Sequence, residues 1–193
     1  MKKSLVSMMA VAAVLAAADA AQAQLPTTPL SVVVRGGLVF PSGDLADEDE
    51  LGGVESGVTL GADLEFAFTP MFSAYAGYSW NQFGIEDVDD ADVTDQGFHA
   101  GVIANFAAGS ISPFVKAGAV MHNLSISVED ESDDAEDESI GFQVGGGVNI
   151  PLGNRLTVVP GVTYTSYNID IDELDEDVTV SHIAAEVGLK IRI

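Results

Sequence analysis

The sequence contains no cysteine, and only 7 lysines and arginines stand against 30 aspartates and glutamates. The lack of cysteine excludes disulfides, cysteine-based zinc sites and thiol nucleophiles, so backbone pairing and packing must hold the fold together. The formal net charge of −23 argues against nucleic acid as a partner, because a phosphate backbone would be repelled. Beyond residue 24 there is no convincing amphipathic helix, and no apolar run reaches the roughly 20 residues of a membrane-spanning helix. These absences favour a fold made of strands.

The first residues have the parts of an export signal. Lys2 and Lys3 precede an uncharged, largely apolar run over residues 5–18, and the small-x-small tripeptide Ala-Gln-Ala follows as a cleavage site. A retained membrane helix is the alternative, but the run is shorter than the roughly 20 residues that such a helix needs. We therefore interpret residues 1–23 as a cleaved signal peptide and residues 24–193 as one exported domain.

The mature sequence alternates apolar residues with small or polar ones at the period of a β-strand. Leu60 and Leu64, for example, share one face of an extended segment, while Thr59 and Asp63 share the other. We expect eight such strands, at about residues 31–40, 58–68, 72–83, 97–106, 111–124, 140–150, 155–169 and 182–193.

The connections between these strands alternate in length. Short turns are expected at residues 69–70, 107–110 and 151–154, and long connections at residues 41–56, 85–95, 127–139 and 170–177. The long connections contain 26 of the 29 acidic residues that follow residue 23. An even strand number with short turns at one end and long loops at the other is typical of an up-and-down membrane barrel. We therefore predict an all-β fold: an eight-stranded antiparallel up-and-down transmembrane β-barrel with short periplasmic turns and long acidic extracellular loops.

The few charged residues outside the long connections lie on the face opposite the apolar one. In a barrel of eight strands that face lines a lumen just wide enough to be filled by side chains, so we predict no wide aqueous pore. Buried charges of both signs are tolerated when they are paired. We expect a structural salt-bridge network, with a proton or ion path as the alternative, at Arg35, Asp63, Glu65, Lys116, Glu186 and Lys190. A water-soluble barrel or sandwich would instead bury the apolar face.

Three segments resemble a known family. Residues 112–118 (SPFVKAG), 141–147 (GFQVGGG) and 187–193 (VGLKIRI) are similar to strands of the small eight-stranded outer-membrane barrels, which include the OmpA transmembrane domain, OmpX-like proteins and the opacity-type barrels. The resemblance covers the whole mature chain. It implies location in the cell outer membrane of a Gram-negative bacterium, contact with membrane lipid and lipopolysaccharide, and insertion by the barrel-assembly machinery. The chain ends in Ile193, whereas such barrels typically end in an aromatic residue.

The histidines offer no catalytic arrangement along the sequence. The spacing of His99, His122 and His182 matches no metal signature. Ser181 adjoins His182, but adjacent residues of a strand point to opposite faces, so these two cannot form a catalytic dyad. We therefore predict that the protein has no catalytic residues and is not an enzyme.

The long acidic connections offer carboxylate oxygens, the ligands that calcium prefers. No EF-hand spacing is present, so we expect weak divalent-cation binding and no other cofactor. The residues concerned are Asp87, Asp89, Asp90, Asp92, Asp95, Asp130, Asp133, Asp134 and Asp137. Diffuse gathering of cations by solvated loops is the alternative, and divalent ions that bridge the loops to lipopolysaccharide are a hypothesis within it.

Two classes of function remain. The first, which we favour, is a non-catalytic envelope protein that stabilises the outer membrane and presents acidic loops to cations, surfaces or other cells. The second is a narrow, porin-like channel for small solutes or ions. We expect a monomer, with no nucleic acid among its partners.

Overall fold

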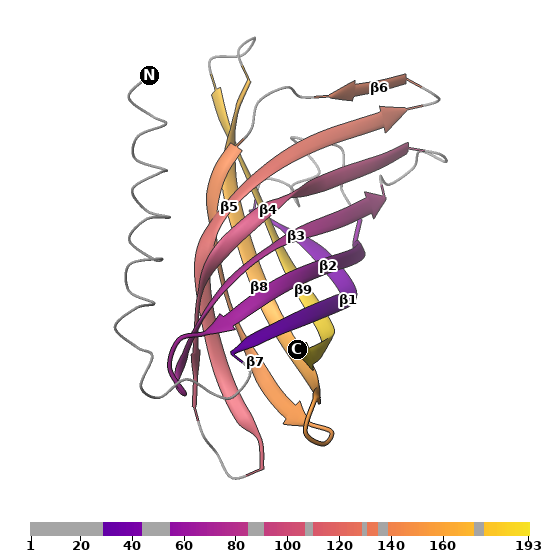
Figure 1. Ribbon diagram of the computed structural model, residues 1–193. Coiled ribbons are helices and arrows are strands. Elements are labelled where there is room, and N and C mark those ends of the chain that lie inside the picture. Colours follow the sequence, from indigo (N-terminus) through magenta and orange to yellow (C-terminus); the bar gives the residue numbers. More distant parts are fainter. Residues whose placement is uncertain are drawn as a thin grey trace, which may run out of the picture.

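The computed structural model describes residues 29–43, 55–84, 91–106, 110–128, 131–134, 139–171 and 176–193 (Figure 1). The predicted signal peptide, residues 1–23, lies outside these ranges and stays a prediction. Within them the chain forms nine strands. In the part of the chain that the structure describes, no helix is long and apolar enough to cross a membrane, a finding that does not bear on strands.

Eight of the nine strands form the wall of a barrel. They are β1 (Leu30–Ser42), β2 (Gly57–Ala67), β3 (Phe72–Gly84), β4 (Ala91–Asn105), β5 (Ser112–Val128), β7 (Ser139–Pro151), β8 (Leu156–Ile171) and β9 (Glu176–Arg192). The short strand β6 (Glu131–Asp134) pairs with residues 125–128 of β5, just past the part of β5 that pairs with β7 (Figure 1).

The first and last strands close the ring. β1 pairs with β9 antiparallel along nearly its whole length, from Ser31 opposite Arg192 to Ser42 opposite Ser181. The other neighbours in the ring are antiparallel as well. Lipid offers no hydrogen-bond partner, so a sheet can span a membrane with its backbone satisfied only if it has no free edge. The predicted fold class, a closed antiparallel barrel of eight strands, is confirmed.

The strand boundaries differ from expectation at the long-connection end of the barrel. β4 begins at Ala91 and not near residue 97, β5 continues to Val128, and β9 begins at Glu176. The added part of β4 is rich in aspartate, which has a low strand propensity, but its backbone pairs with β3 and β5. Pairing and burial outweigh intrinsic propensity in a strand. The wall therefore reaches further towards the long connections than the sequence pattern indicates.

Apolar side chains cover the outside of the barrel. Val34, Leu60, Phe98, Ile140 and Val187, on five different strands, are each more than half exposed. Exposure of this many large apolar side chains would be costly in water, but it suits contact with acyl chains. The alternative of a water-soluble fold, which would bury this face, is therefore wrong.

Glycines on the inner face make room for larger side chains that fill the lumen. A Cβ atom at Gly101 would lie 2.8 Å from the hydroxyl oxygen of Tyr75, and one at Gly118 would lie 2.5 Å from the same atom. Both distances are well inside van der Waals contact, so a larger residue at either position would displace the tyrosine. The inner face thus alternates small and large residues, as expected where eight strands leave just enough space for side chains.

Candidate functional site in the barrel lumen

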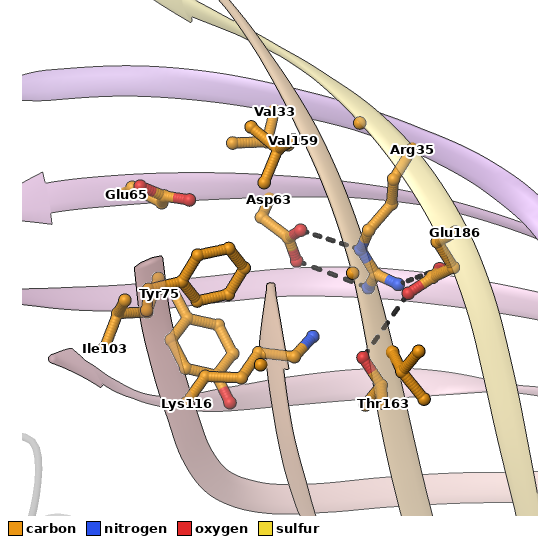
Figure 2. Close-up of a pocket in the computed structure, with 15 residues that line it drawn as sticks. Val33, Arg35, Asp63, Glu65, Tyr75, Ile103, Lys116, Val159, Thr163 and Glu186 are labelled. Carbon is orange, nitrogen blue, oxygen red and sulfur yellow. Dashed lines mark hydrogen bonds and ion pairs between the residues drawn. The ribbon is translucent and has the colours of Figure 1, made fainter. Parts of the chain in front are cut away.

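A cluster of charged side chains lies in the lumen (Figure 2), and its members on β1 and β2 are near the middle of those strands. Arg35 is on β1, between β2 and β9, and its guanidinium binds one carboxylate from each neighbour. Nε donates to Oδ2 of Asp63 at 2.8 Å, and Nη1 donates to Oε1 of Glu186 at 2.6 Å. The three side chains are only 10%, 10% and 6% exposed, respectively. Hydrogen bonds between charged groups are about twice as strong as neutral ones, so this arrangement joins three strands firmly.

His99 extends the cluster across the lumen from β4. Its Nε2 lies 2.5 Å from Oδ1 of Asp63 and 3.1 Å from Nη2 of Arg35. A carboxylate only accepts hydrogen bonds and a guanidinium only donates them, so the hydrogen on Nε2 points to Asp63. Asp63 therefore accepts from Arg35 and His99 together.

A second ion pair lies nearer the short-turn end. Nζ of Lys190 is 2.8 Å from Oε2 of Glu65, and it donates to Oδ1 of Asn149 at 2.9 Å. Nδ2 of Asn149 in turn donates to Oδ1 of Asn105 at 3.1 Å. These bonds join β2, β4, β7 and β9, so the short-turn end of the lumen is also bridged.

Lys116 differs from the other residues of the predicted network, because it forms no ion pair with the side chains that the structure describes. Its Nζ lies 5.8 Å from the centroid of the Tyr75 ring, within the range of a cation–π contact. Lys116 also lines a cavity of about 50 Å³, together with Asp63, Glu65 and Glu186 (Figure 2). One water needs about 10–15 Å³ of such space, so the cavity has room for a few waters. The three basic and three acidic residues of the network balance in charge.

A further polar cluster lies between these charges and the long-connection end. We call it the histidine cluster and define it as Asn81, Asp95, His122, Tyr167 and His182. Oδ1 of Asp95 accepts from Nδ1 of His122 at 2.7 Å and from Oη of Tyr167 at 3.0 Å. Oδ2 of Asp95 accepts from Nδ2 of Asn81 at 3.0 Å. Asp95 is 0% exposed and each of the other four residues is 2% exposed, so the cluster is sealed from water.

His182 is the member of the histidine cluster with an unused ring nitrogen. Its Nδ1 lies 3.6 Å from Oδ2 of Asp95, too far for a hydrogen bond, and has no other partner. The rings of His182 and His122 stack with centroids 6.5 Å apart. Phe83 packs edge-on against His182, with ring centroids 6.0 Å apart, and belongs to an apolar group with Val39, Val93 and Ala184. Two imidazoles therefore lie beside one carboxylate, and apolar side chains pack against His182.

Ser79 lies next to the histidine cluster, and with His122 and Asp95 it forms a series like the catalytic triad of a serine hydrolase. Its Oγ lies 3.4 Å from Nε2 of His122, whose Nδ1 contacts Asp95, as in a nucleophile, base and acid series. Ser79 is only 7% exposed, however, and none of these three residues lines the cavity beside Lys116. A substrate carbonyl must reach the nucleophile to react, and in this structure the hydroxyl of Ser79 is buried away from the cavity.

The sequence did not reveal the histidine cluster because it suggested a long connection at residues 85–95. The expectation that Asp95 is a loop acid is wrong. Its inclusion among the divalent-cation ligands is therefore wrong as well. The residue lies in β4, and its oxygens are occupied inside the barrel. One signal could have found it: Asp95 stands at the same strand period as His99, which the structure places on the inner face.

The other predicted cation ligands belong to two groups. The described strands include Asp92 in β4 and Asp133 and Asp134 in β6, whose side chains are not described. The following lie outside the described residues: Asp87, Asp89, Asp90, Asp130 and Asp137. Among the side chains that are described, no group of three or more histidines and acids is arranged to hold a metal ion. Weak cation binding by the long connections stays a prediction.

A closed antiparallel wall with an apolar outer face and a charge-paired lumen defines a small β-barrel of the outer-membrane class. The sequence model for the outer membrane protein beta-barrel domain matches residues 8–190, and the chain belongs to this family. The family and the fold together imply location in the outer membrane. The comparison with curated proteins gives no match.

Solved outer-membrane barrels share the fold. Neisserial surface protein A matches with a TM-score of 0.69 and 14% identity, over 86% of this chain and 98% of that one. Ail of Yersinia pestis, solved with the heparin analogue sucrose octasulfate, matches with a TM-score of 0.51 and 13% identity, over 84% and 97%. OprG of Pseudomonas aeruginosa matches with a TM-score of 0.50 and 15% identity, over 86% and 98%. At these identities the likeness shows the fold alone.

Proposed function

We propose that the protein is a non-catalytic integral barrel that stabilises the outer membrane and presents acidic loops at the cell surface, where they gather divalent cations. The observation that carries this proposal is the filling of the lumen. Nε2 of Gln143 donates to Oη of Tyr75 at 3.0 Å and joins β7 to β3, and Oη of Tyr167 joins β8 to Asp95 on β4. These two hydrogen bonds and the ion pairs of Arg35 all cross the lumen. They favour a rigid, filled interior over a conducting path.

Conductance across a planar bilayer tests the structural role against the channel alternative. We expect purified, folded protein to insert without discrete conductance steps, because paired side chains occupy the lumen. A porin added to the same bilayer checks that insertion events are detected. Reproducible unit steps from this protein would contradict the proposal and favour the channel.

Cation gathering by the acidic connections needs a separate test. We expect the folded protein in detergent to bind calcium weakly, with many equivalent sites, in isothermal titration calorimetry. Replacing the acids of residues 129–138 by their amides should lower the number of sites, and the same replacement at the interior Glu65 should not. Equal calcium uptake by the wild type and the loop variant would refute a role for this connection.

A further inference from the structure

We propose that the histidine cluster is an acid-sensitive clamp: uptake of a second proton by its two imidazoles loosens the end of the barrel from which the long connections emerge.

The carboxylate of Asp95 has its donors already in place. His122, Tyr167 and Asn81 all donate to it within 3.0 Å, whereas Nδ1 of His182 stays at 3.6 Å. A proton added to Nδ1 of His182 therefore lies too far from Oδ2 to form a hydrogen bond in this arrangement. To approach Asp95, His182 would have to move against the neighbouring side chains that hold its ring in place.

The charge of the cluster changes sign with its protons. With Asp95 ionised, the net charge is −1 with neutral imidazoles, zero with one imidazolium and +1 with two. Tyr167, from β8, stays neutral at physiological pH, and Glu186, the next acid along β9, is bound to Arg35. The residues that lie beside the cluster on the inner faces of β1, β2, β3 and β7 are uncharged: Val39, Thr59, Ser79 and Ser139. The state with one imidazolium is therefore balanced, and a second proton leaves an uncompensated charge away from water.

The position of the cluster means that such a charge would disturb the packing around it. The stacked rings of His122 and His182 would both be positive, and the apolar cover over His182 would keep water from solvating them. The strands that carry the cluster lead directly into three of the long connections. Separation of the rings would thus free the adjoining strand ends. Substitution of His182 leaves the loop carboxylates in place, so the effect of the histidine cluster is separable from theirs.

Amide hydrogen exchange of the full chain in lipid nanodiscs tests the clamp. Protection factors, which correct for the intrinsic effect of pH, are compared at about pH 7 and about pH 5.5. We expect the wild type to lose about tenfold protection in residues 93–97, 119–123 and 180–184, while the middle of β1 and β2 is unchanged. His182→Gln, which removes one proton site, should lose less than about twofold. His99→Gln is the matched histidine control and should keep the wild-type loss.

Two results would overturn the clamp: no loss of protection in the wild type, or the same loss in His182→Gln. If His182→Gln does not fold, the imidazole ¹³C resonances of the wild type decide. Proton uptake by His182 that coincides with the loss of protection is expected. Proton uptake by His182 in step with that by His99, or no uptake in this pH range, would contradict the proposal.

Discussion

Arg35 is the residue on which the charge balance of the lumen most depends, because it contacts carboxylates on two different strands. Among the described side chains, Glu186 has no other basic partner and Asp63 has only His99. Removal of one member of a buried ion pair leaves the other without compensation, and this costs far more than loss of an exposed pair. The stability of the barrel should therefore respond strongly to this one side chain.

We predict that Arg35→Ala lowers the free energy of unfolding by about 3 kcal/mol, because two buried carboxylates lose their guanidinium. Unfolding in urea can be followed by the fluorescence of the single tryptophan, Trp80. Arg155→Ala, at an exposed position beside a short turn, is the control and should change stability by less than about 0.5 kcal/mol. Equal effects of the two substitutions would show that the central ion pairs contribute little.

Ser79 allows a test of the proposed absence of catalysis. Because it is sealed in the lumen beside His122, a fluorophosphonate probe should not label the folded protein, and Ser79→Ala should behave as the wild type in the same assay. Labelling of the wild type that disappears in Ser79→Ala would contradict the proposed non-catalytic role.

The wall strands are the elements that the sequence predicts best, because the half of each strand that faces lipid must be apolar and so imposes a period of two. The same period places Arg35 and Glu186 inside. It does not tell which acid each base will bind, since that depends on the register between strands, and Lys116 indeed has no ion pair among the described side chains. The histidine cluster escaped prediction for a related reason. Its members come from five strands spread between Asn81 and His182, and no local spacing encodes their meeting.

The seam between β1 and β9 can be probed with two adjacent glycines. A Cβ atom at Gly37 would collide with the backbone carbonyl of Ala185 on β9, whereas one at Gly36 would meet the movable end of Leu60, with Cδ2 at 3.0 Å. We predict that Gly37→Ala destabilises the barrel by about 1–3 kcal/mol and that Gly36→Ala is nearly neutral, as measured by the urea midpoint. A larger effect of Gly36→Ala would mean that the seam is not built as described.

The molecule as a whole separates its chemistry into zones. In the part of the chain that the structure describes, apolar side chains cover the outside and paired charges lie in the lumen. In a barrel closed by β1 and β9 each strand of the wall has a partner on both sides, so a detergent has no free edge from which to open it.

Heat modifiability follows from that closure. In a dodecyl sulfate gel, the unboiled protein from the membrane fraction should migrate at a different apparent mass from the boiled protein, because the folded barrel binds less detergent until heat unfolds it. Identical migration of the two samples would mean that the closed barrel does not persist in detergent.

The central claim is that the apolar face of every wall strand contacts acyl chains while the opposite face fills a closed lumen. Accessibility to oxygen, which concentrates in the bilayer interior, tests it most directly. Because the chain has no cysteine, single substitutions can carry a nitroxide label at successive positions of β2 in a lipid bilayer. Labels at Val58→Cys, Leu60→Cys and Leu64→Cys should be relaxed by oxygen, and those at Thr59→Cys and Asp63→Cys should be protected. Protection of the first set with exposure of the second, or the absence of any alternation, would contradict the claim.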